Sequence, residues 1–202
     1  SQNQSAAFNI SNGSGVSNVL FFNIECRYLW GFSFHDRGEN ERVHVIMCRT
    51  LDCANGINVN ANHSLQIGNV ITRSEGIEFS GKYCIVALNQ IKEGQNGGIA
   101  GGGNQSDNTV YPGSIIGFNT IDGITDGVGI VVSDAFVHGA VIGNVVRKCD
   151  QGGLKSYANA GNHVCYGNLF AGNIIASNCE TPGANITGAD IDGTDGQFVI
   201  GN

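Results

Sequence analysis

Several carboxylates in this sequence could carry out acid–base chemistry. Glu78 stands two residues after a glycine in a short apolar segment, and it is the carboxylate at that place of a repeated phrase. Asp107 lies in the polar stretch 101–113, and Asp134 directly follows the apolar segment 130–133. A glycoside hydrolase needs two carboxyl groups, about 5–5.5 Å apart to retain the sugar's configuration or roughly 6.5–9.5 Å apart to invert it. Glu78 with Asp107 or Asp134 is therefore a candidate catalytic pair.

A second carboxylate group is the segment IDGITDG at 121–127, with Asp122 and Asp126. Paired aspartates in glycine-rich corners can bind Ca²⁺, act as acid and base, or cap turns, and all three roles stay open. Both residues are included in the candidate catalytic set. We expect no cofactor and no metal ligand set, with Ca²⁺ at these corners as the alternative.

Cations flank Asp122 in the repeat described below. Lys92 occupies the same place one unit earlier, and Arg147 occupies it one unit later. A cation above and below Asp122 would favour its ionised form, which argues against Asp122 as a general acid. It leaves room for a polysaccharide lyase or C5-epimerase, in which Lys155 or Arg147 would be essential and a uronate carboxylate would be neutralised.

The candidate substrate-binding residues combine aromatic rings with polar groups. Trp30 and Tyr111 could stack on sugar rings, although the only Trp in a chain is more often a packing residue. The full predicted set is Trp30, Tyr111, Lys155, Tyr157 and Arg147.

A short repeated phrase must position all of these side chains. Its first half is an apolar run that ends in Asn and one more apolar residue, as in LQIGNVI, and its second half is Gly followed by alternating apolar residues, as in GIEF. The Gly-led halves begin at residues 31, 56, 76, 98, 129, 153 and about 184. This spacing is too short for β-α-β units, and a stack of coils can bury faces that one strand pair cannot. We therefore predict a right-handed parallel β-helix of about seven coils.

Composition supports an all-β chain. Glycine accounts for 31 of 202 residues and there is one Met, while β-branched residues are abundant. Such a composition favours strands and turns over long helices. We expect residues 1–202 to form one β-helix domain, an internal fragment without its caps, because both ends interrupt a coil.

The phrase N-x-I-x-x-x-x-x-G-I-x-V, clearest at 69–79, resembles the parallel β-helix repeat of pectin-lyase-like proteins. The resemblance covers roughly residues 18–202 and implies the architecture. It carries over no active site, because lyases, glycoside hydrolases, epimerases and non-catalytic spikes share the repeat.

The repeated asparagines predict a ladder of side-chain amides inside the column. The ladder positions are Asn69, Asn89, Asn119 and Asn144. Strict alternation from the ladder makes residues two and four before it inward, and residues one and three before it outward. The predicted inward set is Leu65, Ile67, Ile85, Ala87, Ile115, Gly117, Ala140 and Ile142. The predicted outward set is Val86, Leu88, Ile116, Phe118 and Val141, an apolar row that a parallel homotrimer would bury.

Charge and cysteine content exclude other classes. The net charge is −7, and ten Lys and Arg are scattered along the chain, so we expect no nucleic-acid partner. No apolar run is long enough for a membrane helix, and we expect no membrane insertion. The seven cysteines show no zinc-type spacing and predict buried reduced thiols.

These observations lead to a carbohydrate-recognising β-helix, similar to phage tailspikes that bind and cleave a bacterial surface polysaccharide. The expected partner is a polysaccharide, and the expected location is a virion tail after folding in a bacterial cytoplasm. A secreted or cell-surface protein is the alternative location. A non-catalytic receptor-binding or structural spike, and a lyase or epimerase, are the alternative functions.

Overall fold

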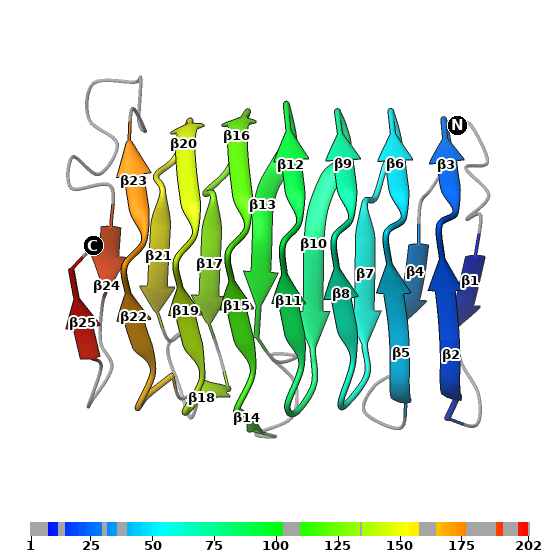
Figure 1. Cartoon of the computed structure of the whole chain (residues 1–202), viewed down its shortest axis with the longest axis horizontal. Coiled ribbons are helices and arrows are strands. Elements are labelled where there is room, and N and C mark those ends of the chain that lie inside the picture. The colour runs from blue at the N-terminus through cyan, green and yellow to red at the C-terminus, as the bar shows by residue number, and fades with distance from the viewer. Residues whose placement is uncertain are drawn as a thin grey trace.

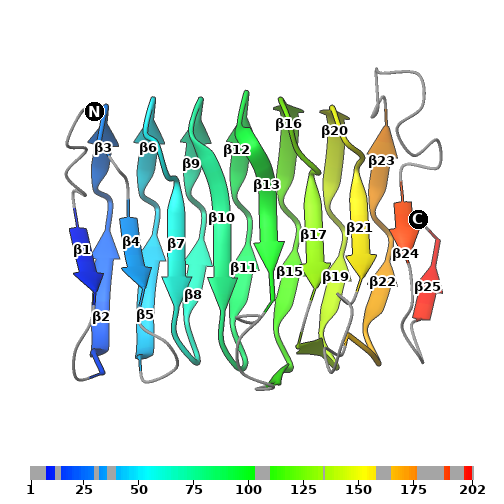
Figure 2. The ribbon, with the colours of Figure 1, turned by 180° about the vertical axis from the view of Figure 1, so that it is seen from behind.

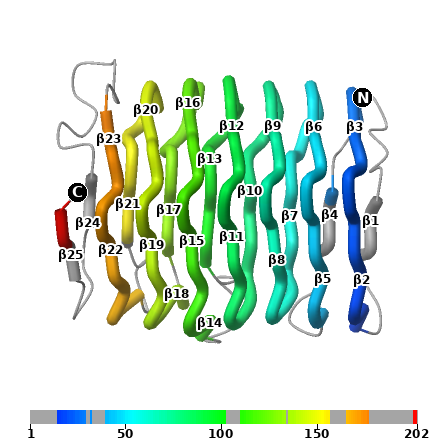
Figure 3. Tube along the Cα trace, in the orientation of Figure 1, coloured from blue at the N-terminus to red at the C-terminus, as the bar shows by residue number. Residues whose placement is uncertain are grey.

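The computed structural model describes residues 8–11, 15–29, 32–35, 40–102, 110–133, 135–157, 165–176, 189–191 and 198–201. Every regular element in these ranges is a β-strand, and the strands wind into a right-handed parallel β-helix (Figure 1). The all-β, parallel β-helix prediction is therefore confirmed. The coil count differs slightly from the seven expected, because two of the sheets each contain eight strands within the described ranges. The tube in Figure 3 follows the coils along the column.

Each turn contributes one strand to each of three long parallel sheets. Sheet A contains β1 (Phe8–Ser11), β4 (Phe32–His35), β7 (Ile57–Asn60), β10 (Glu75–Ser80), β13 (Gln95–Gly101), β17 (Ile130–Ser133), β21 (Leu154–Tyr157) and β24 (Ala189–Ile191). Sheet B contains β2 (Ser17–Phe22), β5 (Glu41–Ile46), β8 (Leu65–Ile67), β11 (Ile85–Ala87), β15 (Ile115–Gly117), β19 (Ala140–Ile142), β22 (Leu169–Ala171) and β25 (Phe198–Ile200).

Sheet C contains β3 (Glu25–Arg27), β6 (Arg49–Leu51), β9 (Val70–Thr72), β12 (Gln90–Lys92), β16 (Thr120–Ile124), β20 (Val145–Cys149) and β23 (Ile174–Ala176). A short fourth sheet pairs β14 (Tyr111–Pro112) with β18 (Phe136–Val137). Sheets B and C run along one side of the column, and sheet A runs along the opposite side (Figures 1 and 2).

The predicted asparagine ladder is present and is buried. The backbone nitrogen and Nδ2 of Asn89 both donate to Oδ1 of Asn119, at 3.0 and 2.9 Å. The same pair of bonds joins Asn69 to Asn89, Asn119 to Asn144, and Asn144 to Asn173. Each of these amides also donates to a backbone carbonyl, as Asn119 does to Val86 at 2.9 Å. The ladder therefore satisfies buried polar groups from coil to coil.

The predicted inward and outward sets in sheet B were wrong because they are reversed. Val86, Ile116 and Val141 are fully buried, whereas their strand neighbours Ile85, Ala87, Ile115, Ala140 and Ile142 are half-buried or exposed. The residue just before each ladder asparagine has a left-handed backbone, with φ of +59° at Leu88 and +57° at Phe118. A left-handed residue turns the chain and breaks the alternation of an extended strand. Leu88 and Phe118 themselves are 60% exposed, so their predicted outward placement is confirmed.

An apolar outer row does exist in sheet B, although it consists of the residues expected inside. Its members stack in register along the sheet. We call this surface the sheet-B face, and its described outward side chains are Leu20, Phe22, His44, Ile46, Leu65, Ile67, Ile85, Ala87, Ile115, Ala140, Ile142, Leu169, Ala171 and Ile200.

The core is built from the inward residues of all three sheets. It contains large side chains such as Phe32, Phe79 and Phe170, together with many Ile and Val. Six cysteines are buried in it as free thiols, as predicted, and Cys179 lies outside the described residues. Burial raises the pKa of the Cys26 thiol to about 11, which keeps it protonated and unreactive at neutral pH.

Candidate functional site

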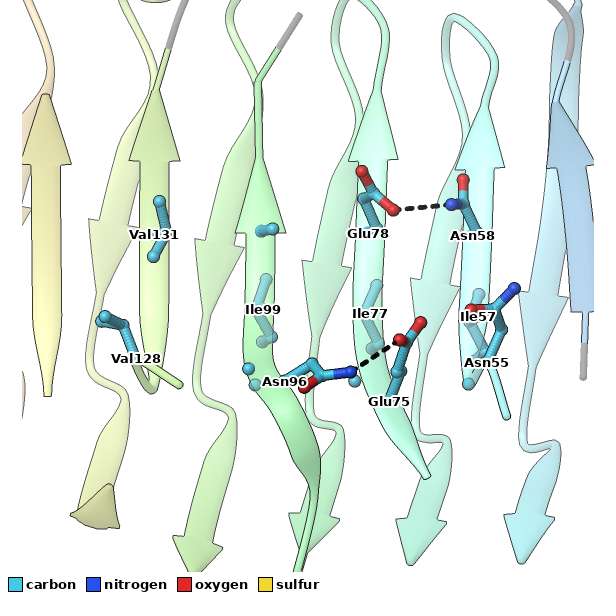
Figure 4. A pocket seen from close by; sticks show the side chains of 15 residues that line it. Asn55, Ile57, Asn58, Glu75, Ile77, Glu78, Asn96, Ile99, Val128 and Val131 are labelled. Carbon is cyan, nitrogen blue, oxygen red and sulfur yellow. Dashed lines mark hydrogen bonds between the residues drawn. The ribbon is translucent and has the colours of Figure 1, made fainter. Parts of the chain in front are cut away.

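An open groove of about 280 Å³ lies on the outer surface of sheet A, across β7, β10, β13 and β17 (Figure 4). We call it the sheet-A groove. It is lined by Asn55, Gly56, Ile57, Asn58, Glu75, Gly76, Ile77, Glu78, Asn96, Gly97, Gly98, Ile99, Ala100, Val128 and Val131.

Stacked glycines explain why this part of the surface is hollow. A Cβ atom on Gly56, Gly76 or Gly98 would collide with a backbone carbonyl oxygen of the following coil. The repeat therefore needs glycine at the start of each sheet-A segment, because neighbouring coils approach too closely there for a side chain. Because these glycines have no side chains, the groove is deeper at them than at the larger residues on either side.

Two carboxylates, Glu75 and Glu78, border the groove from the same strand. Residues three apart in a regular strand point to opposite faces. The pairing of β10 with β13 shifts register between Glu75 and Ile77: Gly76 of β10 faces the three residues 96–98 of β13, so the bulge lies in β13. Regular pairing is interrupted at this place, and both carboxylates line the groove while Ile77 stays buried.

Neighbouring coils supply an amide to each carboxylate. Nδ2 of Asn58 donates to Oε2 of Glu78 at 2.6 Å, and Nδ2 of Asn96 donates to Oε1 of Glu75 at 3.1 Å (Figure 4). Asn58 is only 7% exposed, and within the described part of the chain its Oδ1 accepts no hydrogen bond. The amides therefore help to hold both carboxylates in place.

Glu78 is one of the predicted carboxylates, whereas Glu75 was not predicted. Glu78 is exposed in a register row that runs from Asn58 through Ala100 and Val131 to Lys155. The register continues this row to Asp190, beside Lys155. Glu75 stands before the glycine of the phrase, so only knowledge of the register shift between β10 and β13 could have added it.

Asp122 lies on sheet C and does not line the groove. The predicted register of Lys92, Asp122 and Arg147 is confirmed. Arg147 contacts Asp122 at 3.0 Å, and Lys148 lies 4.0 Å from the same carboxylate. Arg147, a predicted substrate-binding residue, therefore lies on sheet C and forms an ion pair with Asp122. It does not line the sheet-A groove.

Asp126 lies at a corner between two strands. Its backbone is left-handed, with φ of +60°, and its Oδ1 accepts a hydrogen bond from Nε2 of Gln151 at 2.9 Å. Asp122 and Asp126 thus each bond to a neighbouring side chain. Among the described residues, no group of three or more His, Cys, Asp and Glu side chains could hold a metal ion.

Tyr111 cannot serve as the predicted open stacking platform. Its side chain is 7% exposed, and its strand β14 pairs with β18 next to Phe136. The polar stretch before it had suggested an exposed loop, but the tyrosine packs inward at the end of that stretch. Lys155 is half-buried and follows Val131 in register, so it stands one coil beyond the groove.

The remaining predicted residues cannot be placed by their side chains. Trp30, Asp107 and Asp134 lie outside the described residues. Tyr157 is described only by its backbone, which pairs with Ser133. Of the predicted carboxylates that are described, Glu78 reaches the groove, and Asp122 and Asp126 do not.

The comparisons with known proteins leave the geometry as the basis for function. No protein-family model matches the chain, and a search of curated proteins finds no relative. Within the described ranges, the chain forms no helix of the length and hydropathy needed to cross a bilayer.

Proposed function

We propose that this chain is a carbohydrate-recognising β-helix of the phage tailspike type, which binds an extended polysaccharide along the sheet-A groove. The observation that carries the proposal is the groove itself, with two carboxylates and several amides arranged above a glycine floor. Carboxylates and amides are the groups that hydrogen-bond sugar hydroxyls. Stacked coils also extend such a surface along the column, which suits a linear polymer.

The charge of the groove favours an uncharged glycan. Its described lining includes Glu75 and Glu78, but no Lys, Arg or His. An anionic polymer such as a uronate would meet like charge in this groove. A lyase or epimerase needs a cation to neutralise the uronate, so the groove supports that alternative less well than the binding of neutral sugars.

Binding is tested with immobilised polysaccharides of known charge. We expect the 202-residue chain to bind at least one neutral bacterial O-antigen or capsular polysaccharide, and not alginate or polygalacturonate. Glu78→Ala should weaken this binding at least tenfold because it removes an acceptor from the groove, and Ala100→Phe should weaken it by filling the groove.

Glu93→Gln is the matched control, because its side chain is 69% exposed and it does not line the groove. Unchanged binding in Glu78→Ala and Ala100→Phe would contradict the proposed site. Tighter binding of the two uronate polymers than of every neutral polymer would contradict the proposed sugar class.

Hydrolysis is a second candidate function, favoured by the presence of Glu75 and Glu78 on the same strand beside one groove. Three residues of extended strand span at most about 10 Å, which suits the wider carboxyl separation of inverting enzymes. New reducing ends from a bound polysaccharide, lost at least 100-fold in both Glu75→Gln and Glu78→Gln while binding persists, would support it. Binding without product would leave a non-catalytic receptor-binding spike, and unsaturated products would point to a lyase.

A further inference from the structure

Three Asn–Gly pairs occur in the sequence, at 12–13, 55–56 and 96–97, and the last two line the sheet-A groove. Asparagine before glycine is chemically labile, because glycine has no Cβ to keep its backbone nitrogen away from the side-chain amide of the preceding residue. The pair 12–13 lies outside the described residues. The structure therefore allows the two pairs in the groove to be compared.

The main chain around Asn96 is irregular. Residues 96–98 of β13 form the bulge that faces Gly76 of β10. The amides of Gly98 and Ile99 both donate to the following coil, at 3.0 and 2.8 Å, although successive amides of a regular strand point to opposite sides. Asn96 itself is left-handed, with φ of +60°. A bulge disrupts the ladder locally, so the main chain here has the freedom that closure of a small ring requires.

Asn96 and Gly97 also face the solvent. Asn96 is exposed, and Gly97 is half-buried. The residue of the following coil that lies against their peptide bond is Gly127, which has no side chain to cover it, and a Cβ atom there would collide with the backbone nitrogen of Gly97. Water can therefore reach this peptide bond.

The pair Asn55 and Gly56 has the same chemistry in a more rigid setting. Gly56 is buried, and its carbonyl oxygen accepts a hydrogen bond from the backbone nitrogen of Phe32 at 3.1 Å. The strand that follows, β7, pairs with β10 in unbroken register over Ile57–Asn60. Burial and regular pairing restrict the main chain of this pair.

We propose that Asn96 is a site of spontaneous deamidation in the folded protein. The backbone nitrogen of Gly97 loses its proton to water or hydroxide and attacks Cγ of Asn96. The new N–Cγ bond closes a succinimide ring, the Cγ–Nδ2 bond breaks, and Nδ2 takes a proton from water and leaves as ammonia. Water then opens the ring at either carbonyl carbon, which gives aspartate or, where the original main-chain bond breaks, isoaspartate. One water is consumed and one ammonia is released, and no other reactant is needed.

Deamidation changes the groove at the place where Asn96 of β13 meets Glu75 of β10. At present, Nδ2 of Asn96 donates to Oε1 of Glu75 at 3.1 Å (Figure 4). The reaction replaces this donor with a carboxylate oxygen, so two carboxylates face each other across neighbouring coils and repel. The groove thereby loses affinity for its glycan with age. This consequence, unlike the reaction itself, rests on the proposed function.

Mass spectrometry of the aged chain tests the reaction without any glycan. The chain is incubated at about pH 8.5 and about 37 °C, with and without urea, and tryptic peptides are sampled over several days. Asn55 lies in the tryptic peptide 50–73, and Asn96 lies in the tryptic peptide 93–147. In the folded chain, Asn96 should gain about 1 Da at least about fivefold faster than Asn55, with isoaspartate among the products. In urea the two rates should agree within about twofold, because the two dipeptides are identical.

Two results would overturn the proposed reaction. One is a rate at Asn96 that does not exceed the rate at Asn55 in the folded chain. The other is the same excess at Asn96 in urea, because the cause would then lie outside the fold.

The effect on the groove is measured with a polysaccharide that the fresh protein binds. Aged wild type and fresh Asn96→Asp should both bind it at least about fivefold more weakly than fresh wild type. Unchanged binding by Asn96→Asp overturns the effect on the groove. If fresh wild type binds no polysaccharide, the proposed function fails, while the mass measurement still decides whether Asn96 deamidates.

Discussion

Left-handed residues define the corners of this molecule. Seventeen residues other than glycine have positive φ in the described chain, including Leu88, Phe118 and Tyr83. Such a backbone costs an ordinary residue roughly 1–2 kcal/mol, so the surroundings must hold it. Stacking provides part of this support, since the rings of Tyr83 and His63 lie 5.4 Å apart and nearly parallel, and the ring of Phe118 covers Gly143.

Some coils have glycine at this corner and others have a bulky residue, which is why sequence alone did not reveal the corners. At the position just before the ladder asparagine, Met47 in one coil is followed by Gly68 in the next coil, and Phe118 is followed in the same way by Gly143. A glycine marks a turn in a sequence, but a Phe or Leu in the same place indicates a strand. The inward and outward prediction in sheet B failed for the strand residues before this corner, because the left-handed residue breaks the alternation.

His44 gives the sheet-B face a dependence on pH. Burial, and to a lesser extent the charge of Arg42, lower its pKa below the ordinary value of 6.5. The unfolded chain therefore takes up this proton first as the pH falls. Above about pH 6.5 the residue has no effect on pH dependence, and below it the free energy of unfolding should fall, by at most about 1.4 kcal/mol per pH unit.

Urea unfolding of wild type and His44→Gln between pH 8 and pH 5.5 measures this contribution. The difference between the two proteins should be constant above pH 6.5 and should change below it, in favour of the variant. The matched control is His138→Gln, at an exposed corner. A constant difference across the whole range would contradict the assignment to His44.

The pairing of β10 with the bulged strand β13 shows how two neighbouring strands create the candidate site. Strand existence, the glycine at the strand start and the outward direction of Glu78 could all be predicted, because they repeat from coil to coil. The bulge could not, since it depends on how β10 meets β13 and no local pattern in β10 records it. Glu75 was missed for this reason.

Gly76→Ala should damage this element severely. Its Cβ would overlap the backbone oxygen of Gly98, so the two coils would have to separate. We expect a loss of at least about 4 kcal/mol in the free energy of unfolding, or failure to fold. Gly172→Ala should cost about 1 kcal/mol, because Gly172 is left-handed at +61° but meets no atom within 4 Å. Urea midpoints of the two variants make the comparison, and equal shifts would refute the close approach of the coils.

At the scale of the whole molecule, each long face has its own character. Sheet A carries the groove, sheet B is apolar, and sheet C has ion pairs such as Asp122 with Arg147. Fold class, parallel stacking and the ladder followed from the repeat period and composition. Which side chains each sheet exposes could not be predicted in this way, because that depends on the backbone geometry at the corners.

Thermal stability should depend on protein concentration if the chain forms the homotrimer that its sequence predicts. Association stabilises the folded state by mass action, so the melting temperature should rise by about 2–4 °C for each tenfold increase in concentration. Differential scanning calorimetry from 2 to 200 μM measures this shift. A double variant of Leu88→Asp and Phe118→Asp, which places charge on two exposed apolar residues beside sheet B, should show none. A wild-type melting temperature that does not move would argue against assembly.

The buried asparagine column has a direction. Every amide nitrogen in it donates toward the C-terminal neighbour, and every amide oxygen accepts from the N-terminal one. The aligned amide dipoles therefore give the column a donor end and an acceptor end. Gene duplication or deletion could therefore lengthen or shorten it by whole rungs inserted in the same orientation, while an inverted rung would set oxygen against oxygen.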